Sequence, residues 1–171
     1  LTAFSTSPTK FSSRVRLLKS RPCARWIVFP WAQGAAPTKW QCGVDDKPKS
    51  GTIGSSFLIQ QKGKRLTATI DAEVNGKHAG DRINGWLELS GPKGSCTSAI
   101  RHFWQTYPKA VSADRKEMRL ELCSPRAGNV NFISVIAGIA KSHDMMLDFS
   151  PPKEGGQGMT HAQTFLNAWT F

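Results

Sequence analysis

Residues 101–109 concentrate side chains that can bind a ligand and move a proton. The stretch reads Arg-His-Phe-Trp-Gln-Thr-Tyr-Pro-Lys and holds two adjacent aromatic rings, the one Tyr of the chain and three side chains that can carry positive charge. A guanidinium grips a carboxylate with two parallel hydrogen bonds, and His, Tyr or Lys can transfer a proton when its surroundings adjust its pKa. Pro108 cannot donate to a β-ladder, so a strand should end or kink there and present these groups to a ligand.

A second polar segment lies downstream at 141–144, where Lys-Ser-His-Asp follows an apolar run. His143 is the best general-base candidate outside the first stretch, because the unperturbed pKa of histidine lies near neutrality. The other interpretation is a loop histidine that orients a turn together with Asp144. Since each polar segment ends a predicted strand, neighbouring strands in one sheet would bring the two segments together.

The segment Arg-His-Phe-Trp-Gln-Thr-Tyr-Pro-Lys-Ala, at 101–110, resembles a signature of the exo-rhamnogalacturonan lyase (YetA-like) family of polysaccharide lyases. Three further segments agree in order and spacing: Gly-Asp-Arg-Ile-Asn-Gly-Trp-Leu at 80–87, Gly-Ile-Ala-Lys-Ser-His-Asp at 138–144, and a C-terminal tail rich in small and aromatic residues. The resemblance runs from about Phe57 to the C-terminus. Members of that family have a central β-sandwich followed by a helical toroid.

The resemblance implies that the chain is a fragment of a longer lyase, made of the sandwich and the lead-in to a helical domain that follows it. It also implies cleavage of an acidic, rhamnose-containing pectic glycan by β-elimination, with the fragment inactive on its own. The alternative is a non-catalytic basic β-sandwich that binds acidic polysaccharide or supports a catalytic domain. Neither function is expected to need a cofactor.

β-Elimination requires a group that stabilises the uronate while C5 loses its proton, a base that takes this proton, and a proton donor for the departing O4. The catalytic candidates are Arg101, Tyr107, Lys109 and His143, and the substrate-binding candidates are Trp86, His102, Trp104, Gln105 and Lys141. The two tryptophans can stack on sugar rings, or they can be core residues of alternating strands. Likewise, Phe103 and Trp104 can be core residues with the cations forming a solvated rim.

Short segments of period-two alternation, separated by turn signals, predict an all-β antiparallel sandwich. The predicted strands are 14–18, 25–29, 57–61, 66–72, 85–89, 96–105, 118–122 and 145–149, with a strand or short helix at 132–140. Turns are predicted at 62–64 and 75–77. If 96–105 is one strand, Arg101, Phe103 and Gln105 share one face, and His102 and Trp104 take the other.

The sandwich is expected over 56–150. It is preceded by a poorly defined segment, 1–55, with one or two strands and a long connection at 32–56. It is followed by a linker, 151–171, that contains a short helix at 160–169 with Thr160 as its cap.

Basic residues outnumber acidic ones by 23 to 12, and the resulting formal net charge of +11 draws polyanions. The expected partner is an acidic polysaccharide, although the charge can also serve solubility alone. Nucleic acid is not expected, because no recognition helix or RNA-binding signature occurs. A membrane is not expected either, because no run of about 18 apolar residues occurs.

No metal site is expected, since Asp45 and Asp46 read as an isolated acidic pair next to lysines. The four cysteines are far apart in the sequence. They are either buried thiols or partners in up to two disulfides, and a secreted or periplasmic location is slightly favoured.

Overall fold

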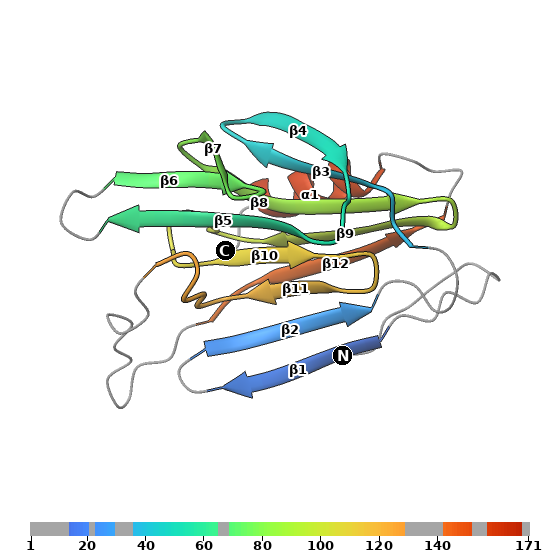
Figure 1. Cartoon of the computed structure of the whole chain (residues 1–171), viewed down its shortest axis with the longest axis horizontal. Helices are drawn as coiled ribbons and strands as arrows, with labels where there is room; N and C mark the ends of the chain where they lie inside the picture. The colour runs from blue at the N-terminus through green and yellow to red at the C-terminus, as the bar shows by residue number, and fades with distance from the viewer. Residues whose placement is uncertain are drawn as a thin grey trace.

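The computed structural model describes residues 14–20, 23–29, 36–64, 69–128, 142–151 and 157–168. They form two antiparallel β-sheets packed face to face, with a helix on the outer face of the smaller sheet (Figure 1). The structure confirms the all-β antiparallel sandwich and the short C-terminal helix. The predicted element at 132–140 lies outside the described residues.

Seven described strands form the larger sheet, in the order β1-β2-β11-β10-β5-β6-β7. Their bounds are β1 (Arg14–Ser20), β2 (Cys23–Phe29), β5 (Phe57–Lys64), β6 (Thr69–Val74), β7 (Lys77–Gly80), β10 (Ala110–Ala113) and β11 (Met118–Glu121). β2 pairs with β11, from Val28 opposite Met118 to Arg25 opposite Glu121. The hairpin β1–β2 is therefore joined to strands from the second half of the chain.

Five described strands form the smaller sheet, in the order β12-β9-β8-β3-β4. Their bounds are β3 (Lys39–Val44), β4 (Lys47–Thr52), β8 (Ile83–Gly91), β9 (Gly94–Ile100) and β12 (Met145–Ser150). β12 pairs with β9, and Met145 lies opposite Ile100. The end of β9 and the start of β12 therefore lie side by side.

The expected long connection at 32–56 is wrong for residues 39–52, because these form the hairpin β3–β4. The strands β1 to β4 all belong to the two sheets. In β3, Trp40, Cys42 and Val44 alternate into the core at 6%, 0% and 1% exposure. β4 is an edge strand, Lys-Pro-Lys-Ser-Gly-Thr, which is mostly exposed. Lysine and proline suit such an edge, so its composition resembles that of a loop. The sandwich therefore begins well before residue 56.

The expected turn at 62–64 is also wrong, because β5 continues to Lys64 and pairs with β6 from Ile59 to Lys64. The expected turn at Asn75 and Gly76 is confirmed, since both have positive φ angles, 54° and 72°. Such angles give the tight reversal that joins antiparallel strands with a two-residue loop.

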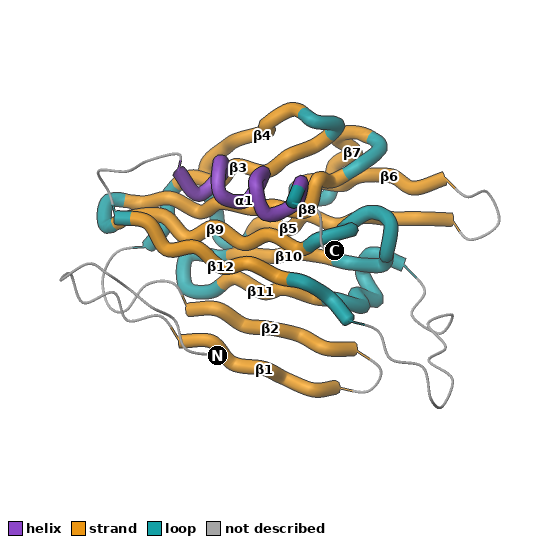
Figure 2. The backbone as a smooth tube through the Cα atoms, turned by 180° about the vertical axis from the view of Figure 1, so that it is seen from behind, coloured by secondary structure: helices purple, strands orange, loops and turns teal. Residues whose placement is uncertain are grey.

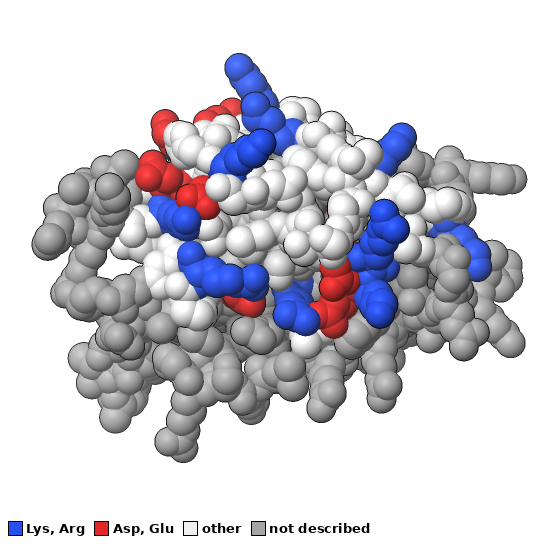
Figure 3. All heavy atoms as spheres, viewed as in Figure 1, with Lys and Arg blue, Asp and Glu red and all other residues white. Residues whose placement is uncertain are grey.

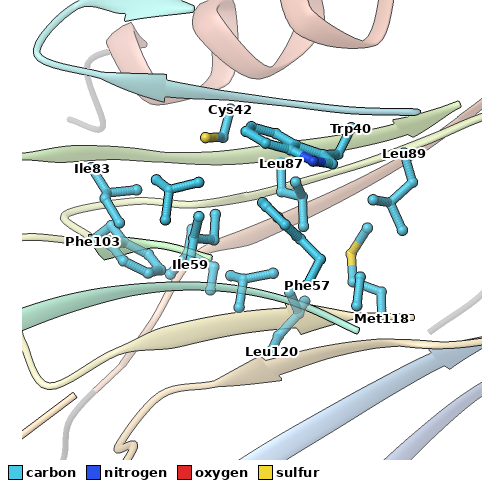
Figure 4. Packing of buried hydrophobic residues seen from close by; sticks show 14 of the residues in the cluster. Trp40, Cys42, Phe57, Ile59, Ile83, Leu87, Leu89, Phe103, Met118 and Leu120 are labelled. Atoms are coloured by element: carbon cyan, nitrogen blue, oxygen red, sulfur yellow. The ribbon is translucent and has the colours of Figure 1, made fainter. Parts of the chain in front are cut away.

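The main core lies between the two sheets (Figure 4). The rings of Trp40 and Phe57 are stacked, with centroids 4.4 Å apart. Leu87 and Leu89 of β8 meet residues of the larger sheet such as Leu120, and all three are at most 1% exposed. This burial removes apolar surface from water and is the main stabilising term of the fold.

The helix α1 (Gln157–Asn167) covers the outer face of β8, β9 and β12 (Figure 2). It buries Ala162 against Trp86 and Ala99, which explains why β9 is buried on both faces. The close approach depends on Gly158, where a Cβ atom would lie 2.0 Å from Thr97 Oγ1. The helix begins at Gln157, so the expectation that Thr160 caps it is wrong.

Candidate functional site

Strand β9 ends at Ile100, and residues 101–106 form turns. Residues 101–107 are called the corner below. His102 has a φ of 54°, which ends the extended backbone, and its carbonyl oxygen accepts hydrogen bonds from Thr106 N at 3.1 Å and Thr106 Oγ1 at 2.6 Å. The prediction of one strand over 96–105 is therefore wrong. The expected alternation, with Arg101, Phe103 and Gln105 on one face, does not apply to this corner.

The corner fits because Gly85 of β8 lies directly beneath it. Gly85 has a φ of 94°, and a Cβ atom there would lie 2.4 Å from the carbonyl oxygen of Ile100 and 2.8 Å from Phe103 Cβ. Phe103 is 1% exposed and belongs to the main core. The glycine thus lets the chain turn tightly while one aromatic side chain anchors the corner to the sandwich.

Lys109 holds the corner from inside. Its side chain is fully buried, and Nζ donates to the carbonyl oxygens of Arg101 at 3.3 Å and His102 at 3.4 Å. A buried ammonium in these contacts supports the backbone of the turn. Lys109, predicted above as a catalytic residue, is therefore buried inside the corner and is not presented to solvent.

Arg101 is only 8% exposed, and its guanidinium contacts other parts of the protein. Nη1 lies 3.3 Å from Asp144 Oδ2, Nη2 donates to the carbonyl oxygen of Phe165 at 2.6 Å, and the guanidinium lies 4.7 Å from the centre of the Phe165 ring. The guanidinium of Arg101, which was expected to bind a uronate, instead links the end of β9 to α1 and to the residues before β12.

The structure brings the described part of the second polar segment beside the corner. Arg101 N donates to the carbonyl oxygen of Asp144 at 3.0 Å, because β9 and β12 are neighbours. His143 precedes Asp144 and is half-buried. Lys141 lies outside the described residues.

The other predicted site residues differ in exposure. Trp86 is 2% exposed beneath α1, so its indole is a core side chain and offers no platform to a sugar. His102 and Gln105 are exposed on the corner. Tyr107 is half-buried, with its ring against Gly63 of β5, where a Cβ atom would lie 2.8 Å from the ring.

Trp104 is the aromatic residue of the corner that borders open space. It is half-buried, and the guanidinium of Arg82 lies 5.1 Å from the centre of its ring. The ring borders a hollow of about 360 Å³, lined by Asp45, Asp46, Asp81, Arg82, Asn84 and Trp104. Three separate segments therefore meet here: the β3–β4 turn, the residues around the start of β8, and the corner.

Hydrogen bonds hold the polar rim of this hollow in place. Asp45 Oδ1 accepts from the backbone N–H groups of Arg82 at 2.9 Å and Asp81 at 3.1 Å. Asn84 Nδ2 donates to Asp46 Oδ1 at 2.7 Å. Asp45 and Asp46 have φ angles of 48° and 61°, which place the two carboxylates on a tight hairpin turn. These bonds orient the side chains of Asp45, Asp46 and Asn84 at the rim.

Asp45 and Asp46 were not expected in a site, because in the sequence they look like an isolated pair. Two acidic residues between the segments 39–44 and 47–52 are a hairpin signal, since Asp tolerates positive φ. Their approach to Asp81 spans 36 positions in sequence and could not be read from local pattern. Acidic side chains gather on the side of the molecule where β4 and β7 lie (Figure 3).

A further group of polar atoms adjoins the hollow through Asp81. Asp71, His78 and Asp81 each offer one ligand atom, and these atoms all lie within 4.8 Å of one another. His78 Nε2 is 3.8 Å from Asp71 Oδ1. Two carboxylates and an imidazole are ligand types that divalent metals accept, so binding measurements on this protein need a chelator control.

No protein-family model and no curated protein matches the sequence. Among the helices of the described residues, none has the length and apolar character needed to cross a membrane.

Proposed function

We propose that this chain is a glycan-binding β-sandwich that serves a polysaccharide lyase, holding an acidic, rhamnose-containing pectic glycan for cleavage by β-elimination. The observation that supports this function is the half-buried Trp104 beside a hollow with a fixed polar rim. An indole face packs against the C–H face of a sugar ring, and a few placed polar groups fix the orientation of a ligand. Carboxylate and amide groups such as those of Asp46 and Asn84 suit sugar hydroxyls.

The charges of the rim favour a neutral sugar in the hollow itself. Three carboxylates line it against one guanidinium, so a uronate there would meet net repulsion. A rhamnose-type residue can place an apolar face on Trp104 and its hydroxyls on the rim. Lys47 and Lys49 are exposed on β4, directly after the Asp45–Asp46 turn, and can attract the uronates of the same glycan.

The burial of two catalytic candidates supports binding over self-sufficient catalysis. Arg101 and Lys109 are 8% and 0% exposed, and their polar atoms contact the backbone and Asp144. Turnover by this chain alone would have to rely on Tyr107 and His143 without the guanidinium of Arg101, which is held in contacts within the protein. We therefore assign the elimination step to the complete lyase and the glycan contact to Trp104.

Replacing Trp104 with Ala should weaken the binding of a rhamnogalacturonan oligosaccharide about thirty-fold. The loss of an aromatic anchor costs about 2 kcal/mol of binding free energy, which corresponds to this change in Kd. Isothermal titration calorimetry at low salt, with a chelator present, measures Kd for the wild type and the variant. Since Trp104 is only half-buried, Tm should change little.

The matched control is Lys116→Ala, an exposed residue in the β10–β11 turn, which should leave Kd unchanged. An unchanged Kd in the folded Trp104→Ala protein would contradict the assignment of the hollow. Release of an unsaturated uronate by the chain alone, followed by its ultraviolet absorbance, would contradict the binding-only function. Raised salt should weaken binding in both proteins, because it screens the attraction between lysines and uronates.

A further inference from the structure

The hairpin β6–β7 presents an imidazole and a carboxylate on one face of the larger sheet. Ala72 and Val74 of β6 belong to the main core, at 0% and 7% exposure. The residues that alternate with them, Asp71 and Glu73, therefore lie on the outer face. His78 of β7 pairs with Glu73, and residues directly opposite each other in an antiparallel pair share one face. His78 is thus a neighbour of Asp71, and its Nε2 lies 3.8 Å from Asp71 Oδ1.

A second carboxylate reaches the same place from the chain segment that follows β7. The pairing of β7 with β6 shifts between His78 and Gly80, and such a bulge changes the direction of the side chains near it. Asp81 comes directly after this irregularity. One ligand atom each from Asp71, His78 and Asp81 all lie within 4.8 Å of one another.

The backbone of Asp81 is held in position by two other side chains. Asp45 Oδ1 and Oδ2 both accept from Asp81 N at 3.1 Å, and Gln61 Nε2 donates to the carbonyl oxygen of Asp81 at 3.0 Å. Gln61 is 0% exposed, and its Oε1 accepts from Ile83 N at 2.8 Å. Both ends of a buried amide therefore fix the chain around Asp81 while the Asp81 residue itself is exposed. Partners outside the ligand set commonly position ligand residues in this way at metal sites.

The basic side chain nearest in the ladder is used elsewhere. Lys62 of β5 is paired with Asp71 in register, but its Nζ lies 2.7 Å from Glu73 Oε1. Gln60 Nε2 donates to the other oxygen of Glu73 at 2.7 Å. In the part of the chain that the structure describes, no lysine or arginine forms an ion pair with Asp71 or Asp81. A cation from solvent would therefore neutralise two carboxylates that the fold does not pair with a basic side chain.

We propose that Asp71, His78 and Asp81 bind one divalent transition-metal ion such as Zn²⁺. Imidazole nitrogen and carboxylate oxygen bind Zn²⁺ at about 2.0–2.2 Å, which places tetrahedral ligand atoms about 3.4 Å apart. Rotation about side-chain bonds closes the wider separations seen here, since Asp81 is exposed and the His78 side chain is 59% exposed. Mg²⁺ and Ca²⁺ prefer sets of oxygen ligands, so the imidazole favours the transition metal.

The first test titrates Zn²⁺ into the whole chain while NMR follows the ring protons of its four histidines. Accessible thiols are first blocked with iodoacetamide, because cysteine is a competing zinc ligand. We expect the signals of His78 to shift until one equivalent of Zn²⁺ has been added, and those of the other three histidines to stay in place. His78→Ala identifies the shifting signals by their absence. Mg²⁺ at the same concentration should leave them unchanged.

The second test measures the Kd of Zn²⁺ by calorimetry, in a buffer without phosphate or chelator. Asp71→Asn and Asp81→Asn keep the shape of the side chain and remove its charge. Each should weaken binding at least about tenfold, because even partners outside the ligand set contribute about 10–100-fold to metal affinity. The matched control is His161→Ala, which removes an exposed histidine that contacts a single carboxylate, Asp148, and should leave Kd unchanged.

A titration in which the His78 signals stay in place would overturn the proposal. So would an unchanged Kd in both Asp→Asn variants, because the imidazole would then bind the ion without the carboxylates. If Asp81→Asn perturbs the fold, its NMR spectrum will show this, and the wild-type titration together with Asp71→Asn still decides the result.

Discussion

Lys109→Ala should lower the free energy of unfolding by roughly 3 kcal/mol, because the variant loses a buried stem and the hydrogen bonds of its ammonium to two backbone carbonyl groups, of which only that of His102 keeps the Thr106 donors described above. In the wild type, the carbonyl oxygens of Arg101 and His102 accept hydrogen bonds from the ammonium of this fully buried residue. For a domain of this size the loss corresponds to a fall in Tm of roughly 6–12 °C. Denaturant unfolding and calorimetry measure both quantities.

The control for this experiment is Lys93→Ala, an exposed residue in the β8–β9 turn, which should unfold like the wild type. A catalytic lysine would behave in the opposite way, since its removal would leave stability intact and abolish turnover. Wild-type stability in Lys109→Ala would therefore show that the ammonium does not hold the corner together.

Gly85→Ala should destabilise the protein by about 3 kcal/mol or more. The new Cβ would lie 2.4 Å from the carbonyl oxygen of Ile100, which is backbone in a paired sheet and cannot move away cheaply. The φ of 94° adds strain for any residue with a Cβ. Urea denaturation should show a lower midpoint with an unchanged slope, as expected when stability alone changes.

The matched control is Gly54→Ala, where the added methyl group meets no atom within 4 Å. This variant should stay within about 0.5 kcal/mol of the wild type, as most surface substitutions do. Equal stability of Gly85→Ala and Gly54→Ala would mean that the corner does not pack on β8 as described.

The sequence predicted strands that alternate on a half-buried surface, such as β11, because period two is visible there. It did not predict β4, since an edge strand protected by lysine and proline resembles a loop. The strand predicted at 96–105 also extends too far, because β9 ends at Ile100. The left-handed backbone of His102 depends on Gly85, on the neighbouring strand, so it cannot be seen in local alternation.

For the candidate site, the sequence allows some of the spatial proximities to be predicted and others not. The proximity of Arg101 and Asp144 follows from two adjacent strands, and such pairing is open to sequence reasoning. The burial of Lys109 and of Trp86 is decided by the corner and by α1, which lie elsewhere in the chain. The rim around Trp104 depends on tertiary contacts of Asp45 that no local pattern contains.

The pairing of β2 with β11 has a consequence for biosynthesis. The β1–β2 hairpin leaves the ribosome before β11, its neighbour in the sheet, which is complete only after Glu121 has been added. Sheets built from such distant pairings fold slowly, because a long loop must close before the contacts form. During that interval the edge of β2 that will pair with β11 is exposed, and it can template association with another chain. Nascent copies of this protein should therefore depend on chaperones during this interval more than proteins whose strands pair in sequence order.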